Sequence, residues 1–146
     1  MPEIRRMVEV LVRGPHEREA ARRAVAEILR CSAAEVGWAT DTGGTKHALD
    51  IFVRGTGFRT QVTLSLEAGS DSPVKTDLDL ARALADKFKE DALLLADPTA
   101  PGMEPFHGLL ARPGGRVYRV PLRELPPDGM GIDEETGSWQ EWILRA

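Results

Sequence analysis

The segments His47–Arg54 (HALDIFVR) and Arg59–Glu67 (RTQVTLSLE) alternate apolar and polar residues with a period of two. Successive side chains of a β-strand point to opposite faces, so each segment would carry one apolar face. The residues expected on these two faces are Leu49, Ile51, Val53, Val62, Leu64 and Leu66. Gly55-Thr56-Gly57 between the segments supplies the permissive backbone of a hairpin loop. The pattern predicts an antiparallel pair of strands with one buried face.

Two amphipathic helices are predicted to cover the sheet that contains this pair. The first would begin at Gly14-Pro15, with Pro15 at the first helical position, and end at Cys31. Its apolar stripe is Ala21, Ala24, Val25, Ile28 and Leu29. The second would begin after Thr76, whose side chain would cap it, and Asp79 would complete a capping box. Its apolar stripe is Leu78, Ala81, Leu84, Ala85 and Phe88. The spacing of both stripes is helical.

Further segments have the composition and length of strands. They are Met7–Val12, Glu35–Thr40, Ala92–Ala96, His107–Arg112 and Arg116–Leu122. The last two flank Pro113-Gly114-Gly115 and form a second hairpin, in which Tyr118, Val120 and Leu122 share one face. The element order β-α-β-β-β-α-β-β-β, with its hairpins, predicts an α+β fold. We expect a two-layer sandwich, with a mostly antiparallel sheet and two helices on one face.

The C-terminal end differs from the rest of the chain in charge and pattern. A length of 146 residues fits one domain, which we expect to span residues 1–125. Residues 126–146 form an acidic, Trp-containing segment that we expect to dock on this domain. Trp139, Trp142 and Ile143 stand at helical spacing, which fits a short docking helix, and an extended segment fits as well.

Composition favours a bacterial cytoplasmic protein. The single cysteine excludes an intramolecular disulfide, and the N-terminus has no apolar stretch of signal-peptide length. The longest apolar run is too short to span a bilayer, so no membrane association is expected. The excess of Arg over Lys is typical of a GC-rich genome. A net charge of −4 without a long basic run disfavours nucleic-acid binding.

The residues that could carry chemistry are few and scattered. Asp41-Thr42-Gly43 is similar to the triplet that carries the catalytic aspartate of aspartic proteases, but that chemistry needs two such loops, and the composition is typical of a turn. None of His16, His47 and His107 has a second His or Cys at metal-ligand spacing. Cys31 would close the first helix as a small apolar side chain. We expect no metal site, no cofactor and no catalytic residue.

The leading hypothesis is a non-enzymatic module that binds a basic protein partner. A small, acidic, single domain without a recognisable site resembles immunity proteins and secretion chaperones in general character. The acidic and aromatic contacts expected from the sequence are Glu134, Glu135, Trp139, Glu141 and Trp142. An alternative is a small-molecule-binding protein or hydrolytic enzyme. Its site would be assembled from Asp41, His47, Asp50 and His107. A third hypothesis is a homo-oligomer that pairs through an exposed edge strand.

Overall fold

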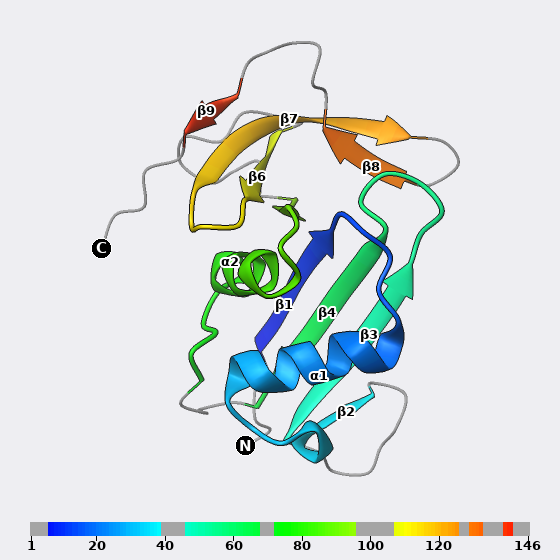
Figure 1. Ribbon diagram of the computed structural model, residues 1–146, viewed down its shortest axis with the longest axis vertical. Helices are drawn as coiled ribbons and strands as arrows, with labels where there is room; N and C mark the ends of the chain where they lie inside the picture. The colour runs from blue at the N-terminus through cyan, green and yellow to red at the C-terminus, as the bar shows by residue number, and fades with distance from the viewer. Residues whose placement is uncertain are drawn as a thin grey trace.

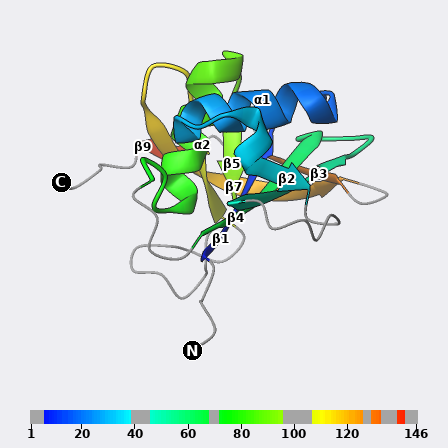
Figure 2. The same cartoon turned by 90° about the horizontal axis from the view of Figure 1, so that it is seen from below.

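The computed structural model describes residues 6–38, 46–67, 72–95, 107–125, 129–132 and 139–141. Its two helices lie on the same side of one mostly antiparallel sheet (Figures 1 and 2), which confirms the predicted α+β sandwich. The helices are α1 (Arg18–Leu29) and α2 (Asp77–Phe88), with a short 3₁₀ helix η1 (Ala33–Glu35) after α1. The strands are β1 (Arg6–Val12), β2 (Val36–Trp38), β3 (His47–Val53), β4 (Thr60–Leu66), β5 (Ala92–Leu94), β6 (His107–Ala111), β7 (Val117–Leu125), β8 (Gly129–Ile132) and β9 (Gln140–Glu141).

The predicted hairpins, β3–β4 and β6–β7, lie on opposite sides of β1 in the sheet. The strand order is β2-β3-β4-β1-β5-β6-β7-β8, and β9 pairs with β7 outside this path. Among the pairs of named strands only β2–β3 is parallel. Since β1 pairs with β4 on one side and with β5 on the other, it joins the two halves of the sheet.

The main core lies between the helices and the sheet. Every second residue of β3 and β4 points toward the helices, as the period of two predicts. The sheet residues buried there include Val8, Val10, Val12, Leu49, Ile51, Val62, Leu64 and Leu66, and the helix residues include Ala21, Val25, Leu80, Ala81, Leu84 and Ala85. Val53 differs from the prediction, because it ends β3 and is 44% exposed.

A second, smaller core lies on the opposite face of the sheet. Its buried residues are Leu11, Phe58, Leu93, Leu110 and Val120, with Tyr118, Leu122, Met130, Ile132 and Trp139 packed around them. The backbone N–H of Phe58 donates to the carbonyl of Met130 at 2.9 Å. The sheet therefore curves until β8 meets the loop between β3 and β4 (Figure 1), and this curvature encloses the second core.

The ends of α1 differ from the prediction, whereas the start of α2 agrees with it. α1 begins at Arg18, because the backbone N–H of His16 donates to Thr60 on β4 and holds the preceding loop against the sheet. It ends at Leu29, after which Arg30 adopts a left-handed φ of 59°. Thr76 caps α2 in the predicted capping box with Asp79. The C-terminal segment contributes the extended strands β8 and β9.

Thr60 ties the loop after β1 to β4. Its side chain is fully buried, its hydroxyl donates to the carbonyl of Gly14 at 2.7 Å, and it accepts from the N–H of His16 at 2.9 Å. Thr60→Val keeps the shape of the side chain but removes the hydroxyl. The carbonyl of Gly14 and the N–H of His16 then lose their partner, so we expect a loss of about 2 kcal/mol in the free energy of unfolding. Urea denaturation measures this loss. Thr63→Val on the same strand is the matched control, and an equal loss there would contradict the assignment.

Candidate functional site

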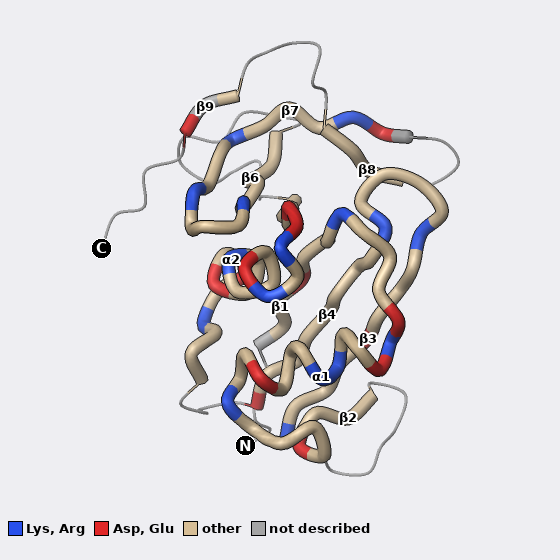
Figure 3. The backbone as a smooth tube through the Cα atoms, in the orientation of Figure 1, with Lys and Arg blue, Asp and Glu red and all other residues tan. Residues whose placement is uncertain are grey.

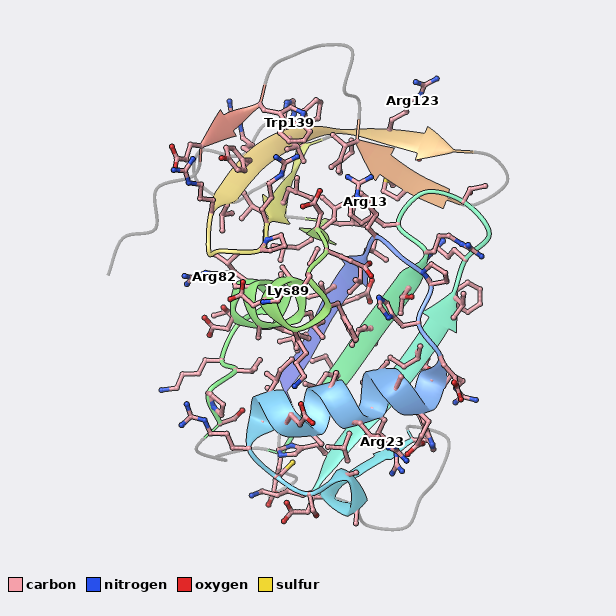
Figure 4. All side chains as sticks on the ribbon, in the orientation of Figure 1. Arg13, Arg23, Arg82, Lys89, Arg123 and Trp139 are labelled. Atoms are coloured by element: carbon pink, nitrogen blue, oxygen red, sulfur yellow. The ribbon has the colours of Figure 1, made fainter. Side chains whose placement is uncertain are left out.

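Trp139 and Glu141 are the predicted contact residues that the structure describes; Glu134, Glu135 and Trp142 lie outside the described residues. Trp139 is half-buried and packs beside Tyr118, with 6.1 Å between their ring centroids (Figure 4). The guanidinium of Arg112 lies 4.8 Å from the centre of the Trp139 ring. These contacts hold Trp139 on the second core. Glu141 is exposed and lies opposite Tyr118 in the β7–β9 pair.

The hairpin of β6 and β7 beside Trp139 is basic. Arg112, Arg116, Arg119 and Arg123 all lie on or next to it, as the blue positions in Figure 3 show. A hydrogen bond with Tyr118, together with the charge of Glu141, raises the pKa of Arg116 above its ordinary value. A basic protein partner would meet like charge here, so this end of the molecule is a poor contact surface for it.

The residues of the alternative site do not converge. Asp41 lies outside the described residues. His47 is 3% exposed and points to the helix side of β3, whereas Asp50 is exposed on the opposite face, as an offset of three residues in a strand requires. His107 begins β6, which is four strand positions away from β3 in the sheet order. The structure thus separates the three described members of that set.

A cavity of about 530 Å³ lies beyond the C-terminal end of α1. Its described lining residues are Leu29, Arg30, Cys31, Glu35, Lys46, His47, Ser72, Pro73 and Lys75. Burial raises the pKa of the Cys31 thiol, and the nearby Glu35 carboxylate raises it further. The thiol is therefore protonated at neutral pH, which is the wrong state for a nucleophile.

The raised pKa of Cys31 predicts that its thiol is alkylated slowly in the folded protein. We expect iodoacetamide at pH 8 to alkylate Cys31 more slowly in the folded protein than in the chain unfolded in urea, because less thiolate is present. Glu35→Gln keeps a side chain that can serve in the capping box around Ser32 but removes the charge, so it should speed alkylation of the folded protein a few-fold. Equal rates for Glu35→Gln and the unchanged chain would contradict the electrostatic cause.

The face of β3, β4 and β1 that points away from the helices is half exposed. We call it the open face. It consists of Met7, Glu9, Ala48, Asp50, Phe52, Gln61, Thr63 and Ser65. Met7 is 67% exposed and Phe52 is 52% exposed, so two large apolar side chains meet solvent on it. Met7 lies in the row of Ser65 and Phe52 in the row of Gln61, so the two do not form one contiguous apolar patch.

Two carboxylates lie in the middle of the open face. Asp50 and Glu9 both stand opposite Thr63 in their strand pairs, so the three form one row across β3, β4 and β1. Two strand spacings, roughly 10 Å, separate the backbones of the two acidic residues. Both are exposed, and neither forms an ion pair with any residue in the described ranges.

Arg54 at the margin of the open face is held by its neighbours. Its guanidinium donates to the side chain of Gln61 at 2.5 Å and lies 5.5 Å from the centre of the Phe52 ring. Arg54 is therefore not paired with either carboxylate of the central row. Asp77, at the start of α2, lies beside the edge of β1 and accepts from the backbone N–H of Glu9 at 3.4 Å.

Glu9 and Asp77 both line a hollow of about 210 Å³ beside β1. Its other described lining residues are Val10, Leu11, Leu93 and Leu95. The hollow adds apolar walls and a further carboxylate to the acidic side of the open face. None of the open-face acids was among the contact residues expected from the sequence. The sequence feature that pointed to the open face was Phe52, an apolar residue at a polar position of an alternating strand.

No group of three or more His, Cys, Asp or Glu side chains that could hold a metal occurs within the described ranges. Of the helices in the described part of the chain, none has the length and apolar character needed to cross a membrane. Compared with known proteins, the chain matches no protein family, no curated protein and no solved structure.

Proposed function

We propose that this chain is a non-enzymatic module of a bacterial cytoplasm that binds a basic protein partner, in the manner of an immunity protein or a secretion chaperone. The observation that carries the proposal is the open face, where two exposed carboxylates without described ion pairs lie between the exposed side chains of Met7 and Phe52. Such a surface fits a partner that presents Lys or Arg beside apolar residues.

The charges favour the open face over the C-terminal cluster as the main contact. Trp139 is engaged with Tyr118 and Arg112, and four arginines lie on or next to the adjoining hairpin. On the open face the charges that form no ion pair with a described residue are negative. They would attract a basic partner and be neutralised by it. The contacts expected from the sequence, Glu134, Glu135, Trp139, Glu141 and Trp142, stay in the proposal as a second candidate contact, to be tested after the open face.

Affinity purification from the cells that produce the protein tests the proposal. The unchanged chain is compared with Glu9→Arg/Asp50→Arg, and Glu17→Arg on the helix layer is the control. Glu17 is exposed and its side chain makes no capping hydrogen bond, so its reversal changes the net charge without touching the open face. A basic protein retained by the unchanged chain and the control, and lost from the double variant, is the expected result. A partner retained equally by all three would place the contact elsewhere.

A further inference from the structure

The hollow beside β1 lies where the element next to that strand changes. β5 pairs with β1 at Leu11 and Val12, and α2 packs against the same strand (Figure 1). At Glu9 the backbone N–H of β1 donates instead to Asp77, in the first turn of α2, at 3.4 Å. The hollow of about 210 Å³ therefore lies between the edge of β1, the end of β5 and the start of α2.

The walls of this hollow are apolar, and its charged groups are acidic. Leu11, Leu93 and Leu95 supply hydrocarbon surface, and Leu95 is 48% exposed, so solvent reaches this wall. Both charged side chains among the described lining residues, Glu9 and Asp77, are carboxylates. A ligand that fits the hollow therefore needs an apolar stem and a cationic end.

The size and the hydrogen-bonding capacity of the hollow indicate an arginine side chain. Sites for small molecules have volumes of about 300–1,000 Å³, so a volume of about 210 Å³ suits a smaller group, such as one long side chain. Arginine combines an aliphatic stem with a planar guanidinium, whose N–H groups can donate to two carboxylates at once. A carboxylate accepts several hydrogen bonds, so Asp77 can hold the N–H of Glu9 and a guanidinium together. Lysine offers a compact ammonium instead of this planar fork.

The dipole of α2 opposes a cation at this place, but the carboxylates outweigh it. The N-terminus of a helix carries the equivalent of about half a positive elementary charge. Asp77 lies in the first turn of α2, and Glu9 adds a second negative charge from β1. The two negative charges exceed the positive end of the dipole about fourfold.

We propose that the hollow is a specificity pocket at the edge of the open face and receives one arginine side chain of the basic partner. This inference rests on the proposed function, because the arginine belongs to the protein that binds the open face. Its guanidinium lies between the carboxylates of Glu9 and Asp77, and its stem lies against Leu11, Leu93 and Leu95. Glu9 belongs to both the open face and the hollow, so one side chain links the two contacts.

A titration of the purified full chain with single-residue probes, followed by NMR of the backbone amides, tests the pocket without the partner. The probes are the N-acetyl methylamides of arginine, of lysine and of citrulline, which has the shape of arginine but no charge. We expect the arginine probe to shift the amide signals of Glu9, Leu11, Asp77 and Leu93 at millimolar concentration. The lysine probe should bind several-fold more weakly, because it lacks the planar fork, and the citrulline probe should not bind.

Two variants separate the charge of the pocket from its wall. Asp77→Asn removes one carboxylate and keeps the size of the side chain, so it should weaken binding of the arginine probe at least about fivefold. Leu95→Ala removes the exposed wall and keeps both carboxylates, so it should weaken the same binding about threefold. The matched control is Glu124→Gln, which removes one charge from an exposed residue of β7 and should leave binding unchanged.

Four results would overturn the inference. They are no binding of the arginine probe at millimolar concentration, equal binding of the citrulline probe, signal shifts that do not include the residues of the hollow, and unchanged binding by Asp77→Asn. Circular dichroism shows whether each variant keeps its fold, and Leu95→Ala makes the test if Asp77→Asn does not fold. Any of these results beside a captured basic partner would remove the pocket and leave the proposed function standing. Arginine-specific binding in the hollow without a captured partner would support the pocket and count against the protein contact.

Discussion

Glu9→Arg/Asp50→Arg is expected to weaken the complex with the basic partner by on the order of 100-fold. Both side chains are exposed and form no ion pair with a described residue, so the substitutions remove nothing that holds the fold together. The free energy of unfolding should change by less than about 1 kcal/mol. The loss of affinity would therefore come from the contact itself, where attraction between opposite charges becomes repulsion.

The salt dependence gives this prediction a second readout. Affinity of the unchanged chain should fall as ionic strength rises, because salt screens attraction between exposed charges. In the double variant the affinity should be low and should no longer fall with salt. Surface plasmon resonance with the purified partner measures both quantities, and Glu17→Arg should behave like the unchanged chain. An affinity of the double variant within about threefold of the unchanged chain would contradict the role of the open face.

Phe58→Ala is expected to lower the free energy of unfolding by about 3–5 kcal/mol, because it leaves a cavity in the second core. Phe58 is 1% exposed and packs with Leu11, Leu93, Leu110 and Val120. Urea denaturation measures the loss. Phe52→Ala is a matched control from the neighbouring strand, where the ring is half-exposed, and it should change stability by less than about 1 kcal/mol. Equal losses for the two variants would contradict the second core.

Gly57→Ala tests the same core through the backbone. Gly57 has a φ of +69°, and a Cβ atom there would lie 2.2 Å from the carbonyl oxygen of Met130. The alanine variant would force β8 away from the loop between β3 and β4, so its loss of stability should exceed about 2 kcal/mol. A truncation after Pro127 removes β8 altogether and should also destabilise the protein. A test of the residues after β8 alone therefore needs a truncation that keeps Ile132.

The two hairpins, both helices and the main core could be predicted from the sequence because they depend on local periodicity. Leu49 and Ile51 alternate with polar residues, and Thr76 and Asp79 form their capping box within one turn. The second core could not be predicted from the sequence. Phe58 lies in a loop, and its partner β8 has the sequence GMGI, which is half glycine and has no apolar pattern. Its pairing depends on contacts between distant parts of the chain.

The candidate surface could be predicted only in part. The alternation places Asp50 and Phe52 on the face opposite Leu49, and in the same way Met7 and Glu9 opposite Val8. The sequence does not indicate which strand pairs with β1. Only the pairing of β1 with β4 brings Glu9 into the row of Asp50. Hairpins between consecutive strands are local, whereas this pairing joins strands separated by two others and a helix.

Site-specific photo-crosslinking tests most directly whether the open face binds a basic protein. A benzoylphenylalanine replaces Phe52 on the open face in one variant and Ala20, exposed on α1, in the other, and each is irradiated in the cells that produce the protein. We expect position 52 to give one dominant covalent adduct with a basic protein, and position 20 not to give it. The open face is not the contact for a basic protein if position 52 gives no adduct, gives the same adduct as position 20, or captures an acidic protein or a second copy of the chain.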